Sequence, residues 1–156
     1  MKKTCGIDSS SKRTSISYFE DDKLIDYIVI DLTKMKDKNE RIDSMLLNIA
    51  KYLNKQKPDY VYQEDTWSGG NPETGNILTT ILGGVRFWCI TNDCVYHKIK
   101  PTVWRSQFGL NKFKAKREEL KQKSIDYVNE KYGICVSDDE ADAILIGLCG
   151  TLINRK

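Results

Sequence analysis

The order in which extended and helical segments follow one another most constrains how this chain can fold. Short runs with alternating or β-branched apolar residues predict strands at residues 4–8, 14–19, 24–32, 60–64 and 94–99. Apolar spacing of three and four, with capping residues and prolines, predicts helices at residues 38–55, about 77–91, 101–105, 114–132 and about 137–152. This order favours an α/β fold: a mixed five-stranded sheet, with three antiparallel strands and then two parallel ones, flanked by helices.

Length and composition fit one domain spanning residues 1–156, because the 156 residues are 40% hydrophobic and 30% charged. No apolar run approaches the roughly 20 residues of a membrane span, and Asp8 lies where a signal peptide needs its apolar stretch. We therefore expect no membrane partner and a cytoplasmic location. The five cysteines are scattered without a C-x-x-C pair, so we expect reduced and mostly buried thiols.

Charge is distributed unevenly along the chain. The formal net charge is only +3, but residues 98–123 hold nine Lys or Arg against Glu118 and Glu119. That stretch therefore carries +7 and the remainder −4. A basic segment of this kind is typical of a surface that binds a polyanion.

Carboxylates occur where buried segments end. Asp8 closes the first strand, Glu64 ends the fourth, and Asp139 and Asp142 lie three residues apart at the start of the last helix. A right-handed crossover would place the first and fourth strands side by side, bringing these groups together. Converging carboxylates repel one another unless they bind a divalent cation such as Mg²⁺, and a two-ion site could hydrolyse a phosphodiester. Taken singly, each carboxylate could equally be a helix cap or a solvated side chain.

Three acidic segments also resemble a known family. Residues 5–11 (CGIDSSS), 61–65 (VYQED) and 139–144 (DEADAI) resemble, in order and approximate spacing, the acidic motifs of RuvC-type Holliday junction resolvases of the ribonuclease H-like superfamily. Residues 99–105 (IKPTVWR) and 114–121 (KAKREELK) look like the basic motif of phage-encoded members. The resemblance covers nearly the whole chain. It implies a homodimeric endonuclease of bacterial or phage-infected cytoplasm, acting in DNA recombination and repair, which nicks four-way and related branched DNA and leaves 5′ phosphates.

The resemblance further implies roles for individual residues. Asp8, Glu64, Asp139 and Asp142 would bind two Mg²⁺ ions, with Mn²⁺ as a substitute, and Asp138 is the alternative to Asp139. A catalytic lysine is implied near the scissile phosphate: Lys116 is favoured, Lys121 comes next, and Lys114 also fits. The helix from about residue 77 corresponds to a dimer interface. We expect DNA contacts from Lys100, Arg105, Lys112, Lys114, Arg117, Lys121 and, by base stacking, Trp67.

Other functions remain open at this point. A related nuclease could act on RNA:DNA hybrids or flaps, and a non-catalytic module could bind branched DNA without metal. The glycine spacing of residues 70–75 lacks the Lys and Ser/Thr of a P-loop, and an actin-like nucleotide site would need a second phosphate loop. His97, the single histidine, is expected to be a structural core or edge residue, and Trp88 and Trp104 are expected to pack in the core.

Overall fold

A computed structural model describes residues 1–65 and 70–156, and they form a mixed five-stranded sheet in the order β3-β2-β1-β4-β5. The pairs β1–β2 and β2–β3 are antiparallel, whereas β1–β4 and β4–β5 are parallel. The predicted sheet, including the pairing of the first and fourth strands, is confirmed. The strands are β1 (Lys3–Ser9), β2 (Arg13–Glu20), β3 (Lys23–Asp31), β4 (Tyr60–Glu64) and β5 (Val95–Ile99).

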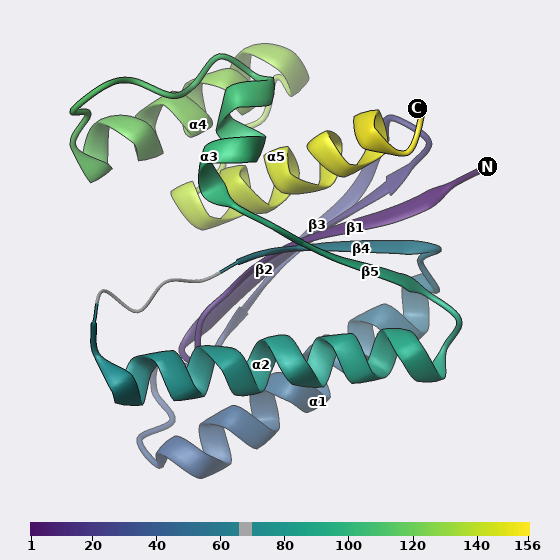
Figure 1. Ribbon diagram of the computed structural model, residues 1–156, viewed down its shortest axis with the longest axis vertical. Coiled ribbons are helices and arrows are strands. Elements are labelled where there is room, and N and C mark those ends of the chain that lie inside the picture. Colours follow the sequence, from purple (N-terminus) through teal and green to yellow (C-terminus); the bar gives the residue numbers. More distant parts are fainter. Residues whose placement is uncertain (66–69) are drawn as a thin grey trace.

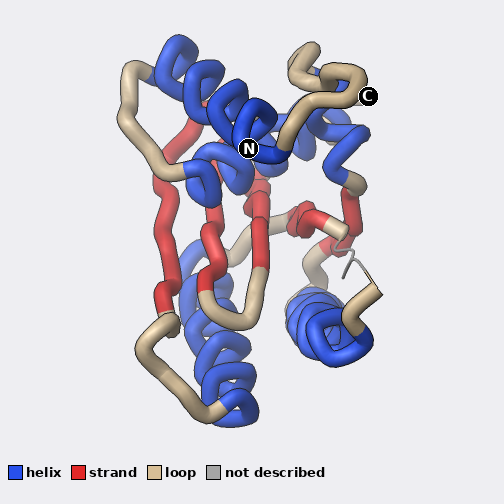
Figure 2. Tube along the Cα trace, turned by 90° about the vertical axis from the view of Figure 1, so that its left-hand side faces the viewer, coloured by secondary structure: helices blue, strands red, loops and turns tan. Residues whose placement is uncertain are grey.

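Helices cover both faces of the sheet, as Figures 1 and 2 show. Two of them, α1 and α2, pack on one face, and the other three pack on the opposite face (Figure 1). The helices are α1 (Lys38–Gln56), α2 (Pro72–Thr91), α3 (Pro101–Gln107), α4 (Arg117–Tyr132) and α5 (Asp138–Ile153). None of the helices described in residues 1–65 and 70–156 is long and apolar enough to span a membrane.

The strand period of two divides the core into two layers. Cys5 and Ile7 of β1 contribute to a cluster with α1 and α2. Neighbouring strands turn Phe19 and Tyr62 toward α5, where they join a second cluster built around Ile144 and other α5 residues. Both faces of the central strands are buried, and small polar side chains such as Thr4 and Ser17 are buried with them.

Helix α5 lies unusually close to the sheet because glycines meet there. A Cβ at Gly6 would overlap the backbone of Ala143 and Gly147, and a Cβ at Gly147 would overlap Ser17 and Phe19. The Ser17 hydroxyl donates a hydrogen bond of 2.7 Å to the Ala143 carbonyl. These contacts fix the position of α5 relative to β1.

Two helix starts differ from the prediction. Helix α2 begins at Pro72 rather than near residue 77, because the Asn71 side chain accepts hydrogen bonds from the backbone N–H groups of Glu73 and Thr74. Helix α4 begins at Arg117 rather than at residue 114, because Lys114 adopts a left-handed backbone with φ of 56°.

The glycine pair of α2 allows close packing at only one of its two positions. A Cβ at Gly84 would overlap Leu46 of α1, whereas a Cβ at Gly83 would meet open space. Only one of the two glycines therefore serves the packing of α1 against α2.

Candidate active site

One edge of the sheet carries the four predicted carboxylates. Strands β1, β3, β4 and β5 run in the same direction, so their C-terminal ends meet at this edge. Asp8 lies near the end of β1, Glu64 ends β4, and the first turns of α5 bring Asp139 and Asp142. All four line one cleft of about 1000 Å³. The structure thus brings together residues that are up to 134 positions apart in sequence.

The carboxylates raise the pKa values of one another. Burial raises the pKa of Asp8 well above its usual value, and the charges of Glu64, Asp142 and Asp139 raise it further. Burial and Glu64 raise the pKa of Asp142 to about 7. Among the described residues, Asp142 Oδ1 is buried without a hydrogen-bond partner. The cleft floor therefore concentrates negative charge that the surrounding protein does not fully neutralise.

Glu64 is held by the indole of Trp104. The Trp104 Nε1–H donates a hydrogen bond of 2.7 Å to Glu64 Oε2, and the Trp104 side chain is completely buried. Burial raises the pKa of Glu64, while the indole N–H and the cations Arg105 and Arg117 oppose that rise. The predicted core role of Trp104 is confirmed, and the structure adds an orienting hydrogen bond to the acidic site.

Asp138 and Asp139 have different surroundings. The Asp138 carboxylate forms an ion pair with Lys121, with 2.7 Å between Oδ2 and Nζ. Burial favours a higher pKa for Asp138, but Lys121 more than offsets it, and the net pKa is lowered. Burial and the adjacent Asp138 raise the pKa of Asp139. Asp139 is therefore the carboxylate whose charge remains less compensated.

The start of α5 is fixed by a capping box. The Ser137 hydroxyl accepts from the Glu140 backbone N–H, and the Glu140 side chain accepts from the Ser137 backbone N–H. Because the neighbouring Glu140 is committed to the cap, Asp139 and Asp142 are the α5 acids left to face the cleft with Asp138.

The four carboxylates are chemically suited to bind a divalent cation, although their side chains are not arranged to enclose one. Within the described ranges, no group of three or more Asp, Glu, His or Cys side chains is arranged to enclose one ion. Carboxylate oxygens are nevertheless the preferred ligands of Mg²⁺. The buried and unpartnered Asp142 Oδ1, together with the raised pKa values, indicates a deficit of positive charge here.

The predicted DNA-binding residues and the favoured catalytic lysine, Lys116, lie in different surroundings. Arg105, Arg117 and Lys121 line the cleft beside the carboxylates. Lys112 instead pairs with Glu119, and Lys116 is exposed at the start of α4 and is not a cleft-lining residue. The remaining predicted contacts lie off the cleft (Lys100 and Lys114) or outside the described residues (Trp67). The catalytic role of Lys116 stays a prediction.

Sequence reasoning missed two parts of the site. The cleft is also lined by Lys12, in the turn between β1 and β2, and by Arg13, the first residue of β2. Behind the carboxylates, the fully buried Gln63 donates 2.9 Å to Ser9 Oγ and accepts 2.9 Å from the Tyr96 hydroxyl. This amide links β1, β4 and β5 at the positions next to Asp8 and Glu64. The sequence signal for this contact was a Gln directly before the motif acid Glu64, in a segment predicted to be a strand.

Expectations for residues outside the cleft are largely met. All five cysteines are free, and only Cys135 is exposed. His97 lies exposed on β5 and stacks on Tyr62 with ring centroids 4.9 Å apart, as a structural edge residue. Trp88 is half-buried and donates 2.8 Å to Asn54 Oδ1.

Comparison with solved structures shows that this chain has the ribonuclease H-like fold seen in RuvC and other Holliday junction resolvases. Thermus thermophilus RuvC in complex with a Holliday junction substrate superposes with a TM-score of 0.77 at 17% identity, covering 99% of this chain and 96% of that chain. The fowlpox virus resolvase, in complex with Holliday junction DNA, gives 0.67 at 18% identity, covering 99% of both chains.

The yeast mitochondrial Holliday junction resolvase is also similar, with a TM-score of 0.59 at 20% identity, covering 96% of this chain and 78% of that chain. No protein-family model matches the sequence, and no curated protein matches it. At these identities, the similarity defines the fold.

Proposed function

We propose that this protein is a metal-dependent endonuclease that resolves four-way and related branched DNA. One observation carries the proposal: Asp8, Glu64, Asp139 and Asp142 line a single cleft beside the cations Arg105 and Arg117. Comparable folds have been solved as Holliday junction complexes. Carboxylates surrounded by cations suit phosphodiester hydrolysis, because the same cleft can hold divalent ions and the substrate phosphate.

The four carboxylates would hold two Mg²⁺ ions, or Mn²⁺ as a substitute. When bound, these ions would supply activation of the attacking water and charge stabilisation at the leaving 3′ oxygen, giving 5′-phosphate products. Trp104 keeps Glu64 in one orientation through its 2.7 Å hydrogen bond. Arg105 and Arg117 would neutralise charge that develops on the phosphate, and Lys121 would do so if released from Asp138.

The basic segment supports binding to the DNA backbone outside the reacting position. Residues 98–123 carry a net charge of +7, and Arg105 and Arg117 make no ion pair with any residue in ranges 1–65 and 70–156. Such contacts would be independent of sequence and sensitive to salt. We place the enzyme in the cytoplasm, where branched DNA of a bacterial or phage genome would occur.

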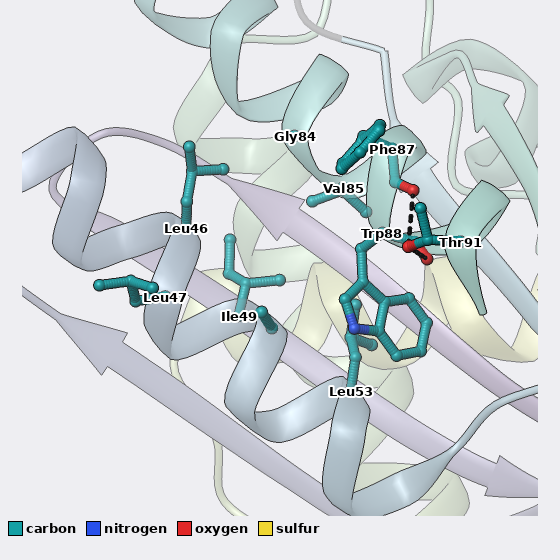
Figure 3. Close-up of a pocket in the computed structure, with 10 residues that line it drawn as sticks. Leu46, Leu47, Ile49, Leu53, Gly84, Val85, Phe87, Trp88 and Thr91 are labelled. Atoms are coloured by element: carbon teal, nitrogen blue, oxygen red, sulfur yellow. Dashed lines mark hydrogen bonds between the residues drawn. The ribbon is translucent and has the colours of Figure 1, made fainter.

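We further propose that the active form is a homodimer formed through α1 and α2. Figure 3 shows an apolar groove between these helices, lined by Leu46, Val85 and Trp88 among others. Leu47 and Phe87 also line it and are 71% and 67% exposed. A two-fold dimer would bury these side chains and would present two clefts to opposing strands of a junction.

The deciding experiment incubates the purified protein with an immobile four-way junction, linear duplex and RNA:DNA hybrid, in Mg²⁺ or EDTA. We expect paired nicks in the junction with Mg²⁺ and none in EDTA. Asp8→Asn should lower the rate by at least about 10²-fold while leaving junction binding within a few-fold of wild type. The exposed Asp43, on α1 away from the cleft, provides the matched control Asp43→Asn.

Other outcomes would select the alternatives. Cleavage confined to the hybrid or to a flap would assign a different substrate to the same fold. Tight junction binding without cleavage in any divalent metal would indicate a binding module and would contradict the proposed nuclease activity.

A further inference from the structure

The cleft has a second cationic wall, formed by the turn between β1 and β2. Lys12, Arg13 and Thr33 line the cleft together with the carboxylates. In the strand order β3-β2-β1-β4-β5, this wall lies on the β2–β3 side of Asp8, whereas Arg105 follows β5 on the other side. The acidic floor is thus flanked by cations from two distant parts of the chain.

The turn has a defined shape. The backbone N–H of Ser10 and its hydroxyl both donate to the Arg13 carbonyl, at 2.9 and 2.7 Å, and the Arg13 N–H donates back to Ser10 Oγ at 2.9 Å. The Leu32 N–H donates 2.8 Å to the Lys12 carbonyl, which joins the turn to the end of β3. The side chains of Lys12 and Arg13 therefore project from an ordered backbone.

The two cations differ in how much of their charge is compensated. Arg13 Nε lies 3.0 Å from Asp31 Oδ2, and the charge of Arg13 also opposes the rise in the pKa of Asp139. Lys12 is exposed and makes no ion pair with any residue in ranges 1–65 and 70–156. Within these ranges, Lys12 is therefore the cation of this wall whose charge is not compensated by an ion pair.

A nucleic-acid strand that brings one phosphate to the carboxylates also carries phosphates on both sides of it. The negative charge of the cleft floor repels these neighbouring phosphates. Among the cations that line the cleft, Arg105 follows β5 and can bind phosphates only on the side of Glu64 that faces away from β2 and β3. Phosphates that continue toward β3 would meet Asp31 and Asp139 unless Lys12 and Arg13 bound them.

We propose that the β1–β2 turn is a second phosphate-binding surface, at which Lys12 and Arg13 bind the DNA backbone on the β3 side of the carboxylates. This inference rests on the proposed function and extends it, because it assigns a path to the bound strand. The strand would cross the sheet edge from Arg105 of α3 to the β1–β2 turn, passing over Asp8 and Glu64.

The experiment measures affinity for a fluorescent four-way junction in EDTA, so that cleavage plays no part, between 50 and 300 mM NaCl. Each lost phosphate contact reduces the slope of log K against log salt by about 0.9. We expect Lys12→Ala to lower the slope by about that amount, and the double variant Lys12→Ala/Arg13→Ala to lower it further. Lys55→Ala removes the same charge from the last turn of α1, at the opposite sheet edge, and should leave the slope unchanged.

Three outcomes are distinguishable. If both turn variants keep the wild-type slope while Arg117→Ala lowers it, the second surface is disproved and the proposed function stands. If wild type shows no salt-dependent DNA binding, the proposed function fails and this inference with it. A slope lowered in the turn variants, with unfolding midpoints equal to wild type, supports the inference.

Discussion

Asp142 is a residue whose ionisation opposes folding in the absence of metal. Burial and Glu64 raise its pKa to about 7 in the folded protein, compared with about 3.9 in an unfolded chain. The group's favourable contribution is therefore complete below about pH 4 and is lost as the pH rises through 7. This dependence follows from a carboxylate that is buried without a hydrogen-bond partner for one of its oxygens.

We expect Asp142→Asn to be more stable than wild type at pH 8 in EDTA, by at most about 4 kcal/mol, since one pKa unit corresponds to about 1.4 kcal/mol. The difference should shrink toward pH 4. Urea unfolding followed by circular dichroism from pH 4 to 8 tests this, with the exposed Asp43→Asn as control. Parallel pH profiles for wild type and Asp142→Asn would contradict it.

Gln63 is a neutral residue that fixes the position of Asp8 relative to Glu64. Its amide, on the same strand as Glu64, bonds to Ser9 of β1, the strand that carries Asp8, and to Tyr96 of β5. Because the side chain is fully buried, both hydrogen bonds form in a low dielectric. The spacing of the two carboxylates therefore depends on a residue that does not face the cleft.

Among the elements, α5 controls the site because it contributes half of the four carboxylates and packs directly on β1 and β2. Gly147 permits this contact, since any side chain there would overlap Ser17 and Phe19. A displaced α5 would carry Asp139 and Asp142 away from Asp8. The acidic site is thus sensitive to a packing position remote from it.

We expect Gly147→Ala to destabilise the protein by about 1–3 kcal/mol through overpacking and to reduce junction cleavage more than tenfold. Gly83→Ala is the matched control, because a Cβ there meets open space and the change should stabilise α2 by about 0.5–1 kcal/mol. Denaturant unfolding and the nicking assay measure both effects. Full activity in a folded Gly147→Ala protein would show that α5 need not lie this close.

In the molecule as a whole, the sheet separates two surfaces with different chemistry. The edge at the strand C-termini bears carboxylates and cations, whereas the α1–α2 face exposes large apolar side chains, among them Leu47, Phe87 and Ile90. Stable protein interfaces bury roughly 1,200–2,000 Å² in total and are centred on such apolar residues. Separate surfaces would allow self-association without blocking the cleft.

We expect sedimentation to show a dimer, and Phe87→Glu to weaken it at least about tenfold in Kd, because a charge would be buried at the interface. The variant should keep its fold and its unfolding midpoint measured under monomeric conditions, since Phe87 is 67% exposed. Lys51→Glu, exposed on α1, tests whether added negative charge alone has this effect. A monomeric wild type at tens of micromolar would contradict the dimer.

The sequence by itself determined the order of the elements, the sheet topology and the placement of Asp8, Glu64, Asp139 and Asp142 at the ends of buried segments. These features are local: periodicity reports which face of a segment is buried, and the handedness of a crossover is nearly invariant. The helix starts at Pro72 and Arg117 could not be predicted as well, because the cap at Asn71 and the left-handed backbone of Lys114 decided them.

Only the tertiary structure decided which cations face the acids. Lys116 is the N-cap of α4 and has an extended backbone, whereas Arg117 is the first helical residue. Their side chains therefore point in different directions, and Arg117 lines the cleft while Lys116 does not. Lys12 and Arg13 also line the cleft only in the assembled fold, because they lie beside the acids once β1, β3 and β4 have packed together. Short-range pattern specifies which residues end each element, but long-range packing specifies which side chains share a cleft.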